Sequence, residues 1–131
     1  MKKIMIVDDS LMMRVSLKKI FEKQGYEVIA EAKDGQDAVE KYMKYKPDLT
    51  TMDITMPVLD GLSALTEIRT RDCDACVVMI SALGQEMKIV EALNKGARHY
   101  IVKPFKEHEV VSKVAGILGT VEEESNALVS R

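Results

Sequence analysis

Five short apolar runs alternate along the chain with five amphipathic stretches, and this alternation limits the fold more than any other feature. The runs span residues 4–7, 28–30, 49–52, 77–80 and 100–102. After each run the apolar spacing changes to three or four residues, which is typical of a helix with one buried face. Strands that alternate with helices form a parallel sheet covered on both faces. We therefore predict an α/β protein with a doubly wound five-stranded parallel sheet.

Residues typical of helix ends stand between the runs. Asp34 is placed to cap a helix that opens at Gly35. Gly25 and Gly96 are predicted to end two other helices, because glycine tolerates the left-handed conformation that a helix end needs. The fourth helix is predicted to carry its apolar stripe on three residues at helical spacing: Met87, Val90 and Leu93.

The length of 131 residues is that of one ordinary domain, and 47% hydrophobic residues suffice for a core. We predict one domain over residues 1–118 and a short acidic tail over residues 119–131. The tail contains three consecutive glutamates, Glu122–Glu124, and is predicted to be frayed or disordered.

The charge and hydropathy of the chain exclude several classes of function. A net charge of −2 indicates neither nucleic-acid binding nor a membrane surface. No apolar run approaches the ~20 residues of a membrane span, and the apolar run near the amino terminus is too short for a signal peptide. We expect a cytoplasmic protein without membrane insertion.

The stretch TMDITMPVLDG, residues 51–61, ends the third apolar run on an acid, Asp53. An aspartate at the end of a buried strand has no packing reason to be there. Burying an ionised carboxylate costs several kcal/mol or more unless a partner offsets it. Asp53 is therefore predicted to belong to a site.

Other polar residues follow the remaining strands. Asp8 and Asp9 come after the first, Ser81 after the fourth and Lys103 after the fifth. Ligands of open α/β sheets bind outside the carboxyl ends of the strands. Each residue alone has an ordinary explanation as a cap, a turn or a surface charge, but the fold brings all of them to one rim with Asp53.

Three carboxylates and one ammonium at one rim carry a net negative charge, so the carboxylates repel one another strongly. A hard divalent cation with oxygen ligands relieves this repulsion, and a shallow carboxylate cluster suits Mg²⁺. The metal and Lys103 then offer positive charge to a phosphoryl group, and the Ser81 hydroxyl can donate to one of its oxygens. Asp53 is the natural nucleophile, because aspartate can form an acyl phosphate.

These motifs resemble the receiver domain of bacterial response regulators. The resemblance rests on Asp8-Asp9, MDITMP around Asp53, Ser81-Ala82 and Lys103-Pro104-Phe105. It covers about residues 2–118 and is greatest for the stand-alone chemotaxis regulators of the family. It implies a flavodoxin-like (βα)₅ fold with the strand order 2-1-3-4-5.

The resemblance also implies the metal ligands and the phosphorylated residue. Asp53 accepts the phosphoryl group from a histidine kinase. Asp9 and Asp53 bind Mg²⁺ directly, the backbone carbonyl of Thr55 is a third ligand, and Asp8 acts through water.

A switch is implied as well. Lys103 pairs with the phosphoryl group, Ser81 moves to bond the group, and Tyr100 turns inward behind Ser81. The peptide bond between Lys103 and Pro104 is expected to be cis. Thr55 and Leu83 occupy positions that tune dephosphorylation. Ser81 stands where threonine is commoner in the family, which keeps the hydroxyl.

We therefore expect a monomeric signalling protein of two-component systems and not an enzyme, although it promotes its own Mg²⁺-dependent phosphorylation and dephosphorylation. Its implied partners are a histidine kinase, a downstream target such as a flagellar motor switch component, and a phosphatase. A phosphorelay intermediate that passes the group to another histidine protein is an alternative. A Mg²⁺-dependent aspartyl phosphatase is a second one, although Asp8-Asp9-Ser10 lacks the spacing of the common aspartyl hydrolases.

Cys73 and Cys76 form a C-x-x-C pair, which admits a redox pair, half a zinc site or two reduced thiols. The pair leads into a strand instead of a helix, and no second pair completes four zinc ligands. The sequence favours reduced thiols.

Overall fold

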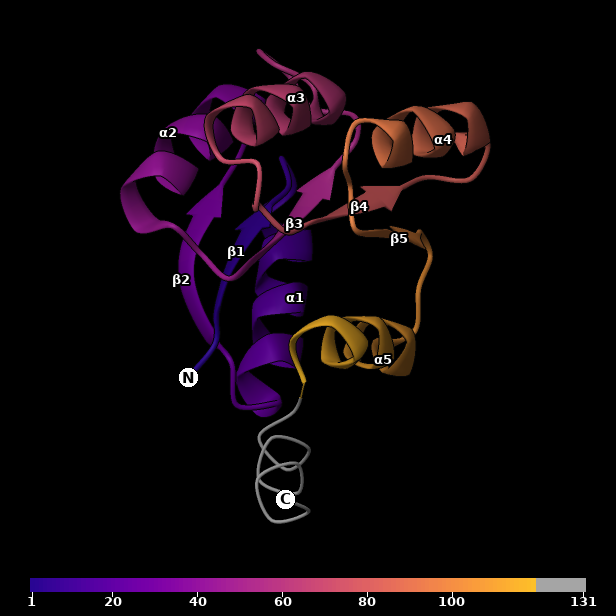
Figure 1. The fold of residues 1–131 in the computed structure, drawn as a ribbon. Helices are drawn as coiled ribbons and strands as arrows, with labels where there is room; N and C mark the ends of the chain where they lie inside the picture. Colours follow the sequence, from indigo (N-terminus) through magenta and orange to yellow (C-terminus); the bar gives the residue numbers. More distant parts are fainter. Residues whose placement is uncertain (120–131) are drawn as a thin grey trace, which may run out of the picture.

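The computed structural model describes residues 1–119. Strands and helices alternate strictly along them, as the apolar runs predict (Figure 1). The elements are β1 Lys3–Val7, α1 Leu11–Lys23, β2 Glu27–Ala32, α2 Gly35–Tyr45, β3 Leu49–Asp53, α3 Gly61–Arg71, β4 Val77–Ser81, α4 Glu86–Asn94, β5 His99–Val102 and α5 Glu107–Leu118.

All neighbouring strands of the sheet are parallel, and their order is β2-β1-β3-β4-β5. This order confirms the predicted doubly wound fold. Because β1 and β3 are neighbours and run parallel, their carboxyl ends are adjacent. Val7 lies opposite Met52 in this pair, so the segments that follow both strands leave the sheet side by side.

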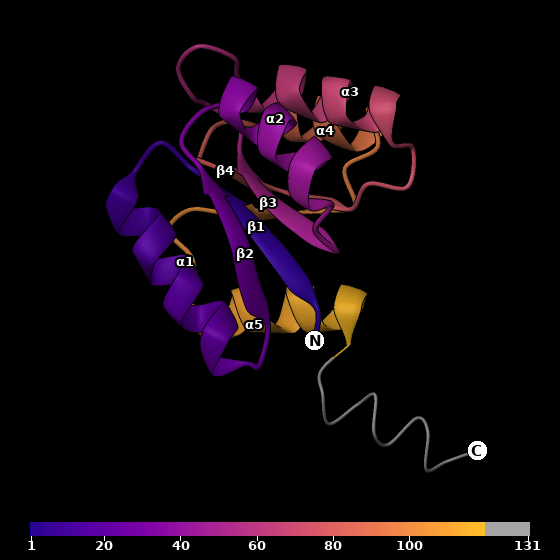
Figure 2. The same ribbon diagram turned by 90° about the vertical axis from the view of Figure 1, so that its left-hand side faces the viewer.

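The helices form one layer on each side of the sheet. Figures 1 and 2 show α1 and α5 on one face, and α2, α3 and α4 on the other. Alternate residues of β1 serve the two cores: Ile4 and Ile6 pack toward α1 and α5, whereas Met5 and Val7 pack toward α2 and α3. A strand buried on both faces therefore appears in the sequence as a continuous apolar run.

Side-chain N-caps stabilise the first turns of α1, α2 and α3. Ser10 accepts a hydrogen bond from the backbone of Met13 at 3.2 Å, and Asp60 accepts one from Ser63 at 2.8 Å. Asp34 caps α2 in the same way, as predicted. Each cap satisfies one of the backbone N–H groups that the first turn of a helix leaves free.

Gly61 begins α3 directly above the end of β3. Its N–H donates to Ile54 at 2.8 Å, and a Cβ atom at this position would collide with the backbone carbonyl oxygen of Asp53. Glycine therefore permits the helix to start against the backbone of Asp53.

Two predictions about elements were wrong in detail. The second strand was predicted over 28–30 but extends to Ala32, because β1 pairs with it as far as that residue. The predicted stripe of α4 does not face the core. Its three residues are exposed by 80%, 51% and 41%: Met87, Val90 and Leu93. The helix buries Ile89 and Ala92 instead.

The predicted acidic tail lies outside the described residues, except for Gly119. None of the helices within residues 1–119 combines the length and hydropathy of a membrane span.

Candidate functional site

The carboxyl ends of four strands bring the predicted site residues to one rim of the sheet. Asp53 is the last residue of β3 and Ser81 the last of β4, while Asp8 and Asp9 follow β1. Lys103 follows β5, and its N–H donates to the carbonyl of Ser81 at 2.7 Å. The parallel sheet therefore gathers residues that are up to 95 positions apart in the chain.

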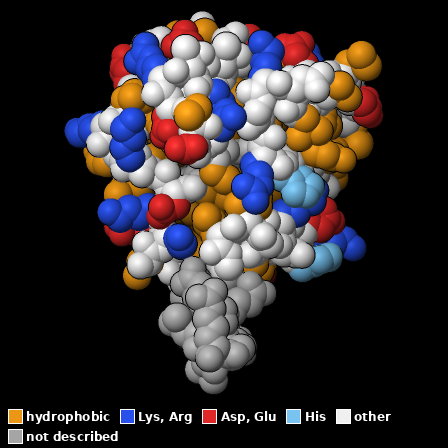
Figure 3. All heavy atoms as spheres, in the orientation of Figure 1, with side chains coloured by type: hydrophobic (Ala, Val, Ile, Leu, Met, Phe, Trp, Pro, Cys, Tyr) orange, Lys and Arg blue, Asp and Glu red, His pale blue; other side chains and the backbone are white. Residues whose placement is uncertain are grey.

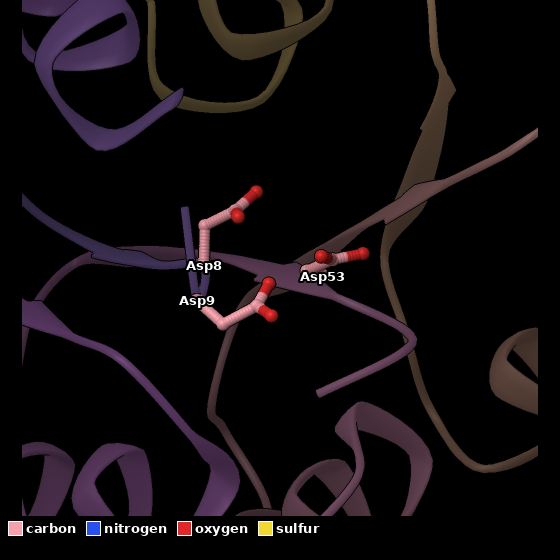
Figure 4. A group of neighbouring side chains, drawn as sticks. All are labelled: Asp8, Asp9 and Asp53. Atoms are coloured by element: carbon pink, nitrogen blue, oxygen red, sulfur yellow. The ribbon is translucent and has the colours of Figure 1, made fainter. Parts of the chain in front are cut away.

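The three aspartates form a carboxylate cluster, in which one oxygen of each lies within 4.8 Å of the others. Figure 4 shows Asp8 and Asp9 leaving the end of β1, with Asp53 beside them at the end of β3. Asp8 is fully buried, Asp53 is 7% exposed, and Asp9 is exposed to solvent. The cluster is thus buried on the side of Asp8 and open to solvent on the side of Asp9.

Lys103 is the cation of the site. Its Nζ lies 3.2 Å from Oδ2 of Asp8 and 3.5 Å from Oδ2 of Asp53. Backbone groups hold Asp8 in place as well, since Ser10 N–H donates to its carboxylate at 2.9 Å. One ammonium therefore offsets part of the charge of three carboxylates, and the cluster keeps an excess of negative charge.

Burial raises the pKa of Asp53 above its ordinary value. The nearby Lys103 ammonium opposes this rise, the negative charge of Asp8 adds to it, and a hydrogen bond from the Thr55 backbone again lowers the pKa. The net upward direction shows that the charged form of Asp53 is not fully compensated by the protein.

The hydroxyl of Ser81 is fully buried and has no hydrogen-bond partner. A buried hydroxyl without a partner costs free energy, so such groups are uncommon in folded proteins. Together with the oxygen donors of the carboxylate cluster, it fits a site for a hard cation and a phosphoryl group: carboxylates suit Mg²⁺, and the hydroxyl can donate to a phosphoryl oxygen.

The remaining predicted residues surround this cluster. Thr55 is exposed two residues after Asp53, and Leu83 is 74% exposed in the segment between β4 and α4. Tyr100 is half-buried in β5, where Lys113 Nζ lies 4.8 Å from the centre of its ring. The Lys103–Pro104 bond is cis, as the family resemblance implies.

One residue at the rim was not predicted. The side chain of Gln85 accepts a hydrogen bond from Ala82 N–H at 2.6 Å and donates one to Oγ1 of Thr55 at 2.9 Å. A glutamine before a helix carries no local signal of such a contact, because its partner lies 30 positions away.

The cysteines lie at the opposite end of the sheet, before β4. Both thiols are free, and burial raises the pKa of Cys76. Among residues 1–119, the only group of three or more acidic, histidine or cysteine side chains that could hold a metal is the carboxylate cluster. Half a zinc site at the cysteines therefore finds no further ligands in this part of the chain.

Comparison with known proteins agrees with this geometry. The sequence model of the response regulator receiver domain matches residues 4–115. The chain is 48% identical over 112 residues to the chemotaxis protein CheY of Bacillus subtilis, an alignment that covers 86% of this chain and 93% of that protein. It is 49% identical over 110 residues to CheY of Thermotoga maritima, with 84% and 92% covered.

Solved structures agree with the sequence relatives. A chain in the CheX-CheY-BeF3-Mg+2 complex from Borrelia burgdorferi has the same fold, with a TM-score of 0.86, 40% identity and 89% of each chain covered. The family match spans every strand end that contributes to the rim. The chain therefore belongs to the response regulator receiver domain family and is a response regulator of two-component signalling.

Proposed function

We propose that Asp53 accepts a phosphoryl group from a phosphohistidine of a histidine kinase, and that the modified chain then binds a chemotaxis target. One observation carries the proposal: the buried Asp53 carboxylate shares Lys103 with Asp8 inside a cluster that keeps excess negative charge. The similarity to CheY proteins supports the chemotaxis role and a location in the cytoplasm.

Mg²⁺ is the cation that fits the carboxylate cluster best. Asp9 and Asp53 would hold it directly, the backbone carbonyl of Thr55 would be a third ligand, and Asp8 would act through water. When bound, the ion supplies positive charge that offsets the phosphoryl oxygens. The Borrelia burgdorferi complex contains Mg²⁺, which supports this assignment.

The transfer conserves atoms and charge in a simple way. A carboxylate oxygen of Asp53 attacks the phosphorus, an O–P bond forms, and the N–P bond of the phosphohistidine breaks. The departing imidazole keeps the electron pair of that bond and takes up a proton. Lys103 stays beside the phosphoryl oxygens, and Ser81 gains an acceptor for its hydroxyl. Water later attacks the acyl phosphate and releases phosphate.

The phosphodonor has open access to this side of the site. A groove of about 580 Å³ runs beside Lys103, between α1 and the segments that follow β4 and β5. Its lining includes Met13, Ala82 and Phe105. The groove therefore offers a donor group mostly apolar walls and one cation, Lys103.

The output surface is the apolar side of α4. Figure 3 shows hydrophobic side chains gathered over this helix. The exposed residues there are Leu83, Met87, Val90 and Leu93. We propose that phosphorylation shifts Ser81 and Tyr100, and with them the face formed by α4, β5 and α5, so that a motor component or another target binds it. A CheX-like protein is a second partner class.

The test is incubation with a small acyl phosphate and Mg²⁺, followed by mass measurement of the intact chain. We expect a gain of one phosphoryl group, which Asp53→Asn abolishes. Asp74→Asn is the matched control, because Asp74 is exposed at the other end of the sheet. Labelling of Asp53→Asn at the wild-type rate would rule the assignment out.

The same labelled protein separates the alternatives. Back-transfer to a histidine protein would point to a phosphorelay intermediate. Sustained turnover of an added phosphomonoester would point to a Mg²⁺-dependent phosphatase.

A further inference from the structure

The side chain of Gln85 connects two segments that flank the phosphoryl-accepting residue. Its carboxamide oxygen accepts from Ala82 N–H at 2.6 Å, and its NH₂ group donates to Oγ1 of Thr55 at 2.9 Å. The first segment follows β4 and the second follows β3. Gln85 is the first residue before α4, yet its side chain makes no capping bond to that helix.

Both ends of this connection lie next to groups of the site. Ala82 directly follows Ser81, whose buried hydroxyl has no partner. The Thr55 backbone hydrogen-bonds to the carboxylate of Asp53. A half-buried glutamine therefore spans the rim between the hydroxyl on one side and the nucleophile on the other.

We propose that Gln85 is a positioning residue that restrains phosphoryl uptake by Asp53. The inference rests on the proposed function. A phosphoryl group on Asp53 introduces three strong acceptor oxygens beside Ser81. The Ala82 N–H is the adjacent backbone donor, but the Gln85 carboxamide engages it. The N–H turns to a phosphoryl oxygen only after it leaves Gln85, so the carboxamide competes with the modified aspartate for one donor.

The size of the restraint follows from ordinary hydrogen-bond energetics. One exchanged hydrogen bond corresponds to about a fivefold change in an equilibrium or rate. The second contact, to Thr55, keeps the carboxamide in place, so the two contacts act as a unit. A bond that merely stabilises the loop would have the opposite effect, because its loss would disorder the segment after Ser81 and slow uptake.

The variant Gln85→Met tests the direction of this effect, since methionine keeps the length of the side chain and lacks the amide. With a small acyl phosphate and Mg²⁺ we expect its initial labelling rate to rise about fivefold. Thr55→Val removes the acceptor hydroxyl but keeps the backbone carbonyl, and we expect a rise in the same direction. In the Thr55→Val background, Gln85→Met should add less than it does alone, as coupled residues do.

Gln36→Met is the matched control, because the exposed Gln36 bonds to Glu40 within α2. Amide hydrogen exchange gives a readout without phosphorylation: the Ala82 N–H should exchange about fivefold faster in Gln85→Met than in the wild type.

Each result decides the matter. Unchanged or slower labelling of Gln85→Met, beside a labelled wild type, overturns the restraint and leaves the proposed function standing. Unchanged exchange of the Ala82 N–H also overturns it. A wild-type chain that takes up no label overturns the proposed function, and the role of Gln85 with it.

Discussion

At the scale of single residues, the ionisation of Asp53 depends on the charge of Lys103. Burial and the charge of Asp8 disfavour the ionised form of Asp53, and the Lys103 ammonium favours it. Because Lys103 also contacts Asp8, its charge is shared between two carboxylates. The site therefore holds a destabilising charge in the absence of metal.

Asp53→Asn should stabilise the metal-free protein at pH 7. The pKa of Asp53 is raised in the folded state, so between 3.8 and that higher value the folded chain binds more protons than the unfolded chain. Stability then falls as the pH rises through this window, and the cost persists at pH 7. Removing it should increase the free energy of unfolding by about 1 kcal/mol and Tm by about 4 °C.

Thermal unfolding of the wild type and of Asp53→Asn, in chelator at pH 7 and pH 3, measures this gain in stability. The gain should be present at pH 7 and absent at pH 3, where the carboxyl group is protonated in both states. The exposed Asp74→Asn should show no gain at either pH. An equal gain at both values would mean that charge is not its cause.

Lys103→Ala should separate metal binding from switching. The three carboxylates remain, and the loss of a competing cation leaves Mg²⁺ affinity equal to that of the wild type or higher. The phosphoryl group, however, loses its ammonium partner. We expect calorimetry to show retained Mg²⁺ binding, while binding of a target no longer responds to phosphorylation. A target that still distinguishes the two forms would contradict this role.

At the scale of elements, β3 combines two functions. It delivers Asp53 to the rim, and it crosses the centre of both cores with all five residues buried. Two of them, Thr50 and Thr51, have buried hydroxyls without hydrogen-bond partners. The strand therefore buries two hydroxyl groups that make no hydrogen bond.

Thr51→Val should stabilise the protein, because valine has nearly the same shape and a high strand propensity, and it removes an unpaired hydroxyl from the core. We expect about 1 kcal/mol in urea unfolding, and a similar gain for Thr50→Val. Thr70→Val is the control, since the Thr70 hydroxyl donates to the carbonyl of Thr66 at 2.7 Å on an exposed face of α3. A loss of stability in the β3 variants would show that their hydroxyls are satisfied in solution.

Gly61→Ala should destabilise the fold and impair the site together. The added Cβ collides with the carbonyl oxygen of Asp53, so either α3 or the end of β3 must shift. We expect a loss of about 1–3 kcal/mol and slower phosphoryl uptake. Gly116→Ala gives the contrast: nothing lies within 4 Å of a Cβ there, and alanine in a helix should stabilise by up to about 1 kcal/mol. Equal effects of the two substitutions would show that the close approach at Gly61 is unimportant.

At the scale of the whole molecule, the sheet decides which side of α4 meets solvent. Apolar residues cover more than one face of this helix, and packing on β4 and α3 selects Ile89 and Ala92 for burial. Val90→Ser should change the free energy of unfolding by less than about 0.5 kcal/mol. Ile89→Ser, one residue earlier and 8% exposed, should cost about 2–4 kcal/mol. Urea unfolding of both measures this, and similar losses would contradict an exposed apolar face.

Much of this protein could be predicted from local sequence. Strand positions follow from continuous apolar runs, because a strand buried on both faces has no polar side. The rim also follows, since a parallel sheet brings all carboxyl strand ends to one edge. Five residues stand at or just after such an end: Asp8, Asp9, Asp53, Ser81 and Lys103. The spacing of apolar residues and the place of polar residues relative to the strand ends were sufficient here, because both follow from the backbone geometry of strands and helices.

The tertiary structure decided what depends on contacts between distant segments. The exposed side of α4, the shared Lys103, the close approach at Gly61 and the bridge of Gln85 to Thr55 each require two elements to be placed relative to one another. The spacing of apolar residues in α4 is compatible with more than one buried face, and only packing against the sheet decides which face is covered. A glutamine side chain finds its partner only after the loops are packed. The sequence by itself determined the order of the elements and which side chains stand at the rim, whereas packing determined the distances between those side chains.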